Sequence, residues 1–194
     1  MPVVVNGVKE LQKAMRDVDP ALNKEMSKNI KVAMTVIQNT ARGYLPAQED
    51  VLSGWGKGTS STGTINYRAF PAYDYSLARS LIKYSAGTNK RNRAGFRAAF
   101  YVANISAPGA IFETAGRKNR NGAPNSQSLN PNAGVNFIES AENLSTMKGE
   151  GKQKGRLIYR AWFEESNRVI PAVVKAIDTV ATDFNKKTQL GKAA

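Results

Sequence analysis

One long helical stripe constrains the fold of this chain more than any other feature. Apolar and aromatic side chains recur three or four residues apart along it: Leu22, Met26, Ile30, Ala33, Ile37, Ala41 and Tyr44. This spacing places all of them on one face of an α-helix. Asp19 and Pro20 supply an N-cap and a first-turn proline, and Pro46 stops the helix, because the residue before a proline leaves the α region. The sequence therefore predicts a long helix with one face that must be buried.

Two other segments carry helical spacing. Gly7–Val18 predicts a short amphipathic helix, and a second pattern begins near Leu157 and Ala161. The later stripe of this second pattern comprises Ile170, Val173, Ile177, Val180, Ala181 and Phe184. Because Pro171 lies inside it, we expect a kink there or the start of a further helix.

The middle of the chain is predicted to be β-structure. Ser80–Ala86 and Ala94–Asn104 are strand candidates, joined through the turn-prone basic segment Gly87–Arg93. In the second candidate, apolar side chains alternate with others, as in a half-buried antiparallel strand. Helices at both ends and a small antiparallel sheet between them predict an α+β fold in a single domain, residues 1–194.

Two long segments are predicted to lie outside this core. Residues 46–79 form a glycine- and aromatic-rich arm, and residues 117–155 an exposed polar loop region. The aromatics of the arm dock either on the protein's own surface or on a neighbouring subunit, and both interpretations stay open. They are the candidate subunit-interface residues: Trp55, Tyr67, Phe70, Tyr73 and Tyr75.

The composition narrows the possible chemistry. The chain contains no Cys and no His, which removes disulfides, thiolate nucleophiles, imidazole acid–base catalysis and the common zinc sites. We therefore expect no catalytic residues, no metal and no cofactor. No apolar run is long enough to span a bilayer and no signal peptide opens the sequence, so we expect a soluble protein that has no membrane partner.

The charge favours contact with a polyanion. The chain has 28 Lys and Arg residues against 15 Asp and Glu residues, a formal net charge of +13. Two basic loops supply the candidates for contact with DNA or with a partner protein: Lys90, Arg91, Arg93, Arg117, Lys118 and Arg120. A third basic cluster spans Lys148–Arg160. The alternative interpretation is a set of solvated loop charges. No base-reading motif is present, so any contact with DNA is expected to be to phosphates.

The decapeptide Ala107–Gly116, APGAIFETAG, is the most informative motif. Pro108 and Gly109 predict a turn after the strand, and Ala110–Ala115 is either a short strand or a helical turn. Glu113 is the carboxylate in the apolar part of the motif. We expect a structural role for it, through hydrogen bonds to turn amides or to Arg97 or Arg117, because no acid–base partner lies beside it.

Phe112, Glu113 and Gly116, with the elements around them, resemble the small tail-component proteins that complete the head–tail junction of long-tailed bacteriophages. In that family a strand leads through a small-residue turn into an aromatic–Glu–x(x)–Gly element, between a long N-terminal helix and a C-terminal helix. The resemblance covers roughly Val8–Lys187. Leu22–Tyr44 matches the long helix and Phe96–Val102 the central strand.

The resemblance implies two helices packed on one face of the sheet, and a homo-oligomeric ring that joins the tail tube to the head connector around the DNA passage. A hexamer is expected, acting as a tail-completion or tail-terminator protein without catalysis. The implied partners are further copies of the chain, head connector or stopper proteins, tail-tube proteins and, non-specifically, packaged DNA. The implied location is the virion neck, after assembly in the host cytoplasm. Two other classes stay open: a non-specific nucleic-acid-binding protein, and a small hydrolase built on Glu113.

Overall fold

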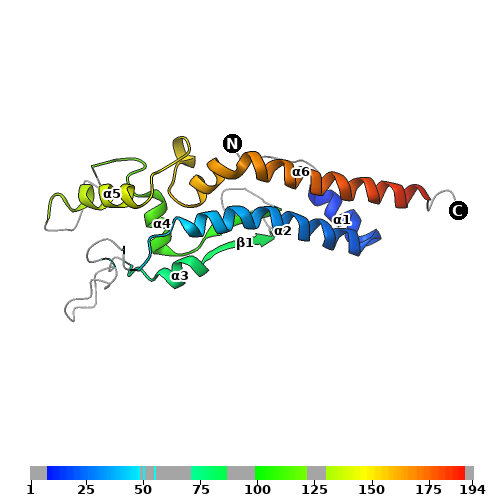
Figure 1. The fold of residues 1–194 in the computed structure, drawn as a ribbon. Coiled ribbons are helices and arrows are strands. Elements are labelled where there is room, and N and C mark those ends of the chain that lie inside the picture. The colour runs from blue at the N-terminus through cyan, green and yellow to red at the C-terminus, as the bar shows by residue number, and fades with distance from the viewer. Residues whose placement is uncertain are drawn as a thin grey trace. The chain divides into compact units, whose positions relative to one another are not determined.

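The computed structural model describes residues 8–48, 50, 55, 71–86, 99–121 and 130–190, and Figure 1 shows their elements. The helices are α1 (Val8–Val18), α2 (Pro20–Gly43), α3 (Tyr75–Ser80), α4 (Ala107–Thr114), α5 (Ala133–Leu144) and α6 (Ile158–Leu190), with a 3₁₀ turn, η1 (Gly151–Gln153), before α6. The strands β1 (Ile82–Ala86) and β2 (Phe100–Asn104) pair as a small antiparallel sheet. The α+β prediction is confirmed.

The long helix forms as its sequence pattern predicts. Asp19 caps α2, because its Oδ1 accepts a hydrogen bond from the backbone N–H of Leu22 at 3.2 Å. The stripe residues from Leu22 to Ala41 are buried, and the helix ends at Gly43, ahead of Pro46. Local spacing and local caps were therefore sufficient for this element.

The chain divides into two compact units. Unit 1 comprises Met1–Ile37, Tyr84–Tyr101 and Glu165–Ala194, and unit 2 comprises Gln38–Lys83 and Val102–Glu164.

The core of unit 1 is built from α1, the first part of α2 and the later part of α6. Its buried members are Met15, Leu22, Met26, Ile30, Ala176 and Val180. Phe100 of β2 packs against this cluster, as do Ile177 and Phe184 of the predicted C-terminal stripe. Lys187 forms an ion pair with Asp19 at 2.6 Å. Helix α6 continues through Pro171, so no second helix starts there.

The core of unit 2 contains an aromatic cluster around Trp55. The Trp55 ring centroid lies 5.0 Å from that of Tyr73, 5.2 Å from that of Phe137 and 6.4 Å from that of Phe112. The Trp55 Nε1–H donates to the carbonyl oxygen of Pro71 at 2.9 Å, and the Tyr73 hydroxyl donates to that of Pro46 at 2.5 Å. Burial and these bonds anchor both aromatics inside the protein.

For Trp55 and Tyr73, two of the candidate subunit-interface residues, this cluster favours the interpretation that they dock on the protein itself, because both are buried in its core. Tyr75 is half-buried at the start of α3, where the Arg79 guanidinium carbon lies 5.9 Å from its ring centroid. Tyr67 and Phe70 fall outside the described residues.

Two predicted boundaries were wrong, and a third is only partly described. Ser80 ends a helix, α3, and the first strand begins only at Ile82. Residues 117–155 are no continuous exposed loop, because they contain α5 and η1. Of the second strand candidate, Phe100–Asn104 forms β2, while its first residues, 94–98, lie outside the described part of the chain.

Candidate functional site

The site begins with α4, which carries the Phe112–Gly116 element. Ser106 caps this helix, since its hydroxyl accepts a hydrogen bond from the backbone N–H of Gly109 at 3.1 Å. Pro108 lies in the first helical turn, where its missing N–H costs nothing. The Pro108–Gly109 pair therefore starts a helix rather than forming the predicted turn, and the open choice for Ala110–Ala115 is decided in favour of a helix through Thr114.

Glu113 of α4 caps the distant N-terminus of α6. Its Oε2 accepts hydrogen bonds from the backbone N–H groups of Leu157 at 2.5 Å and Ile158 at 3.1 Å. Its Oε1 accepts from the N–H of Tyr159 at 3.0 Å. The first N–H groups of a helix have no partner inside the helix, and they carry the positive end of its dipole. The side chain of Glu113, only 5% of whose residue surface is exposed, satisfies them across a sequence separation of 44 to 46 residues. We refer to this arrangement as the Glu113 cap.

Two glycines near the Glu113 cap lie where a side chain has no room. A Cβ added at Gly155 would lie 2.2 Å from the Glu113 Oε1, so a side chain there would displace the carboxylate. Gly116 has a φ of +78°, a conformation that L residues rarely adopt, and a Cβ there would lie 2.6 Å from Cγ2 of Ile138. The glycine that completes the Phe112–Glu113 element is thus required both for the backbone turn and for its packing on α5.

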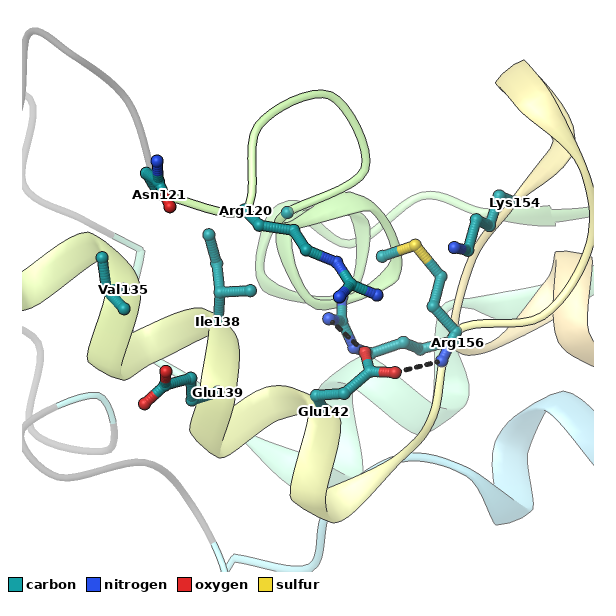
Figure 2. Close-up of a pocket in the computed structure, with 10 residues that line it drawn as sticks. Arg120, Asn121, Val135, Ile138, Glu139, Glu142, Lys154 and Arg156 are labelled. Atoms are coloured by element: carbon teal, nitrogen blue, oxygen red, sulfur yellow. Dashed lines mark hydrogen bonds and ion pairs between the residues drawn. The ribbon is translucent and has the colours of Figure 1, made fainter.

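Arg156 reciprocates the Glu113 cap from the segment just before α6. Its Nη1 donates to the carbonyl oxygens of Phe112 at 3.2 Å and Ala115 at 2.6 Å, at the C-terminal end of α4. Its Nη2 forms an ion pair at 2.9 Å with Glu142 of α5, seen in Figure 2. A helix C-terminus attracts cations, as its N-terminus attracts anions. The two side chains therefore hold α4, α5 and the start of α6 together.

Burial changes the proton affinity of both groups. It raises the pKa of Glu113, against the three backbone N–H groups and the nearby charge of Arg117, which favour the carboxylate. It lowers the pKa of Arg156, against the charge of Glu142. The lone pairs of Glu113 face helix amides, and no second carboxylate among the described residues hydrogen-bonds to it. This geometry supports the predicted structural role; the donors are amides at the start of α6 rather than turn amides, Arg117 lies near as a charge, and Arg97 falls outside the described residues.

The predicted basic residues separate into three groups. Arg117 is half-buried and donates to the carbonyl oxygens of Lys152 at 2.8 Å and Lys154 at 3.5 Å, so the fold uses it internally. Lys118 and Arg120 are exposed. Lys90, Arg91 and Arg93 fall outside the described residues.

Sequence reasoning missed Arg156, which it placed in an exposed basic cluster although the residue is 1% exposed. One local signal was available. The residues just before α6, Gly155, Arg156 and Leu157, include none of the usual N-cap side chains. A long helix that begins without a local cap needs an acceptor from elsewhere in the chain.

No protein-family model matches this chain, and neither a curated protein nor a solved structure does. In the part of the chain that the structure describes, no group of three or more acidic side chains is placed to hold a metal ion. None of the described helices has the length and apolar character needed to cross a membrane.

Proposed function

We propose that this chain is a structural protein of a bacteriophage virion. Copies of it form a ring at the head–tail junction, as a tail-completion or tail-terminator protein, and join the tail tube to the head connector around the DNA passage. The observation that carries the proposal is the Phe112–Glu113–Gly116 element. It lies between the strand β2 and the C-terminal helix, in the order typical of the phage family that the sequence resembles.

The geometry of this element supports a mechanical role for it. Glu113 and Arg156 join three helices through seven hydrogen bonds. In one of them the backbone N–H of Arg156 donates to the carbonyl oxygen of Glu113. The side chains form the other six, with Leu157, Ile158, Tyr159, Phe112, Ala115 and Glu142. A hydrogen-bond network of this kind keeps the fold of a subunit rigid when the subunit contacts its neighbours in a ring. The net charge of +13 suits a passage for DNA, whose phosphates attract basic side chains without sequence preference. Lys118 and Arg120 are the described candidates for that contact.

Disrupting the gene in a phage that carries it tests the proposal. We expect DNA-filled heads and finished tails that fail to join, counted by negative-stain electron microscopy. An epitope-tagged copy should restore joining, and antibody against the tag should mark the neck. Normal numbers of joined virions without the gene product would refute the proposal.

The net charge also favours the second candidate, a non-specific nucleic-acid-binding protein. The two functions differ in the purified protein. A DNA-binding protein of this class binds a short duplex as a monomer, with an affinity that falls steeply with salt. A junction protein self-associates or joins tail particles. Light scattering for mass and fluorescence anisotropy with a labelled duplex, across a range of salt concentrations, distinguish them.

A further inference from the structure

A cavity of about 220 Å³ lies in unit 2, beside α5 and apart from the carboxylate of Glu113. Figure 2 shows its lining, which comes from α5, from the segment that follows α4 and from the segment that precedes α6. Sites for drug-sized molecules usually enclose about 300–1,000 Å³, so this cavity suits a smaller group.

Arg156 provides the first sign that the cavity is a binding site. Its two terminal nitrogens are occupied by Phe112, Ala115 and Glu142. Its Nε, in contrast, is buried and has no hydrogen-bond partner among the residues that the structure describes. A buried N–H group without an acceptor is costly and uncommon in folded proteins. Arg156 is among the residues that line the cavity, so an anion bound there lies beside a guanidinium whose hydrogen bonds are incomplete.

Two further cations line the same cavity. In Figure 2 the guanidinium of Arg120 extends toward that of Arg156. Helix α5 lies on one side of Arg120, and Lys154 lies on the other. Neither Arg120 nor Lys154 forms an ion pair with another described residue. Cations that converge repel one another, and an anion between them removes the repulsion.

The remaining lining residues restrict the kind of anion. Glu139 and Glu142 also line the cavity, so its three cations and two carboxylates leave one uncompensated positive charge. That balance suits a single negative charge. Val135, Ile138 and Met147 give the cavity an apolar wall, which suits the methylene groups of an aliphatic stem.

We propose that this cavity binds the carboxylate of an acidic side chain, Asp or Glu, from a neighbouring protein chain. Arginine donates to carboxylates through paired N–H groups, and Arg120, which lines the cavity without an ion pair to a described residue, supplies such donors. A DNA phosphate fits less well. The two carboxylates that line the cavity, Glu139 and Glu142, repel a polyanion. The inference does not depend on the phage function, since it concerns the chemistry of one cavity.

The test uses the full chain and N-acetylglutamate N-methylamide, which has one carboxylate on a short stem. The Nε–H resonance of Arg156 is followed by ¹H–¹⁵N NMR at constant ionic strength. We expect a saturable shift with this probe and none with its neutral glutamine analogue. The double variant Arg120→Gln/Lys154→Gln should weaken binding roughly five- to tenfold, as expected for lost charge-assisted hydrogen bonds.

A matched double variant controls for net charge. Lys118→Gln/Lys152→Gln removes the same charge from exposed residues that do not line the cavity, and it should leave the affinity unchanged. Equal weakening in both double variants, or no saturable shift in the wild type, would overturn the proposal. So would tighter binding of inorganic phosphate or a DNA duplex, because either would identify a phosphate site.

Discussion

Replacing Glu113 with Gln probes the Glu113 cap with minimal change in shape. The wild-type carboxylate presents two oxygens to three backbone N–H groups of α6. Glutamine keeps one oxygen, which can retain the bonds from Leu157 and Ile158. Its amide NH₂ then faces the N–H of Tyr159, and two donors oppose each other.

The expected loss follows from this geometry. A buried N–H group left without an acceptor costs about 1–3 kcal/mol. Loss of the negative charge at the helix N-terminus costs about 0.3–1 kcal/mol. Burial disfavours the charged form of Glu113 and raises its pKa, so removing the charge also removes this desolvation cost and partly offsets the loss. We therefore expect Glu113→Gln to lower the free energy of unfolding by about 2–3 kcal/mol.

Urea unfolding followed by tryptophan fluorescence measures this loss, because Trp55 packs near Phe112 in the same unit. Glu150→Gln is the control, since it makes the same change at an exposed position just before η1, where the side chain forms no cap hydrogen bond. The control should stay within about 0.5 kcal/mol of the wild type. If Glu113→Gln did the same, the cap would not be stabilising α6, and the structural role argued for Glu113 would be wrong.

Three further predictions concern single residues. Gly155→Ala should destabilise the protein by about 1–3 kcal/mol, because the new Cβ would meet the Glu113 carboxylate, whereas Gly43→Ala, with no atom within 4 Å of its added Cβ, should not; urea unfolding compares them. Tyr44→Phe should raise the pKa of Glu164, which the Tyr44 hydroxyl chiefly lowers, as an NMR titration would show. A carboxyl group whose pKa is lowered on folding stabilises the folded protein at pH values above its unfolded-state pKa. The stability difference between wild type and Tyr44→Phe should therefore be present at neutral pH and vanish as the pH falls through the folded-state pKa of Glu164. An unchanged Glu164 titration would contradict the assignment. Ile30→Asp should unfold the protein by burying an unpaired charge, while Val32→Asp, at a 65% exposed position of the same helix, should leave it folded by circular dichroism; an unchanged melting temperature for Ile30→Asp would refute the assigned buried face.

Local sequence determined the elements whose signals lie within a few residues. The stripe from Leu22 to Ala41, with Asp19 as cap, was sufficient for α2, because helical spacing and capping act within one or two turns. The spacing of the C-terminal stripe likewise predicted a helix, and α6 continues through Pro171. For α5 the signal was weak. Asn132 precedes it without a side-chain cap bond, and its half-buried Phe137 packs on the distant Trp55.

Tertiary structure decided everything that depends on partners far apart in the chain. Sequence alone marked Glu113 as the carboxylate of an apolar segment. It could not show that this carboxylate accepts a hydrogen bond from the backbone N–H of Leu157, 44 residues away. It placed Arg156 in a basic cluster, either solvated or in contact with a polyanion, because its partners Phe112, Ala115 and Glu142 lie far away in the sequence. Trp55 and Tyr73 read as surface aromatics because their neighbours in sequence are polar and flexible types. Their burial depends on Phe112 and Phe137, which approach them only in the folded chain. Spacing specifies a helix locally, whereas the burial of a charge or a ring depends on which distant groups are present to satisfy it.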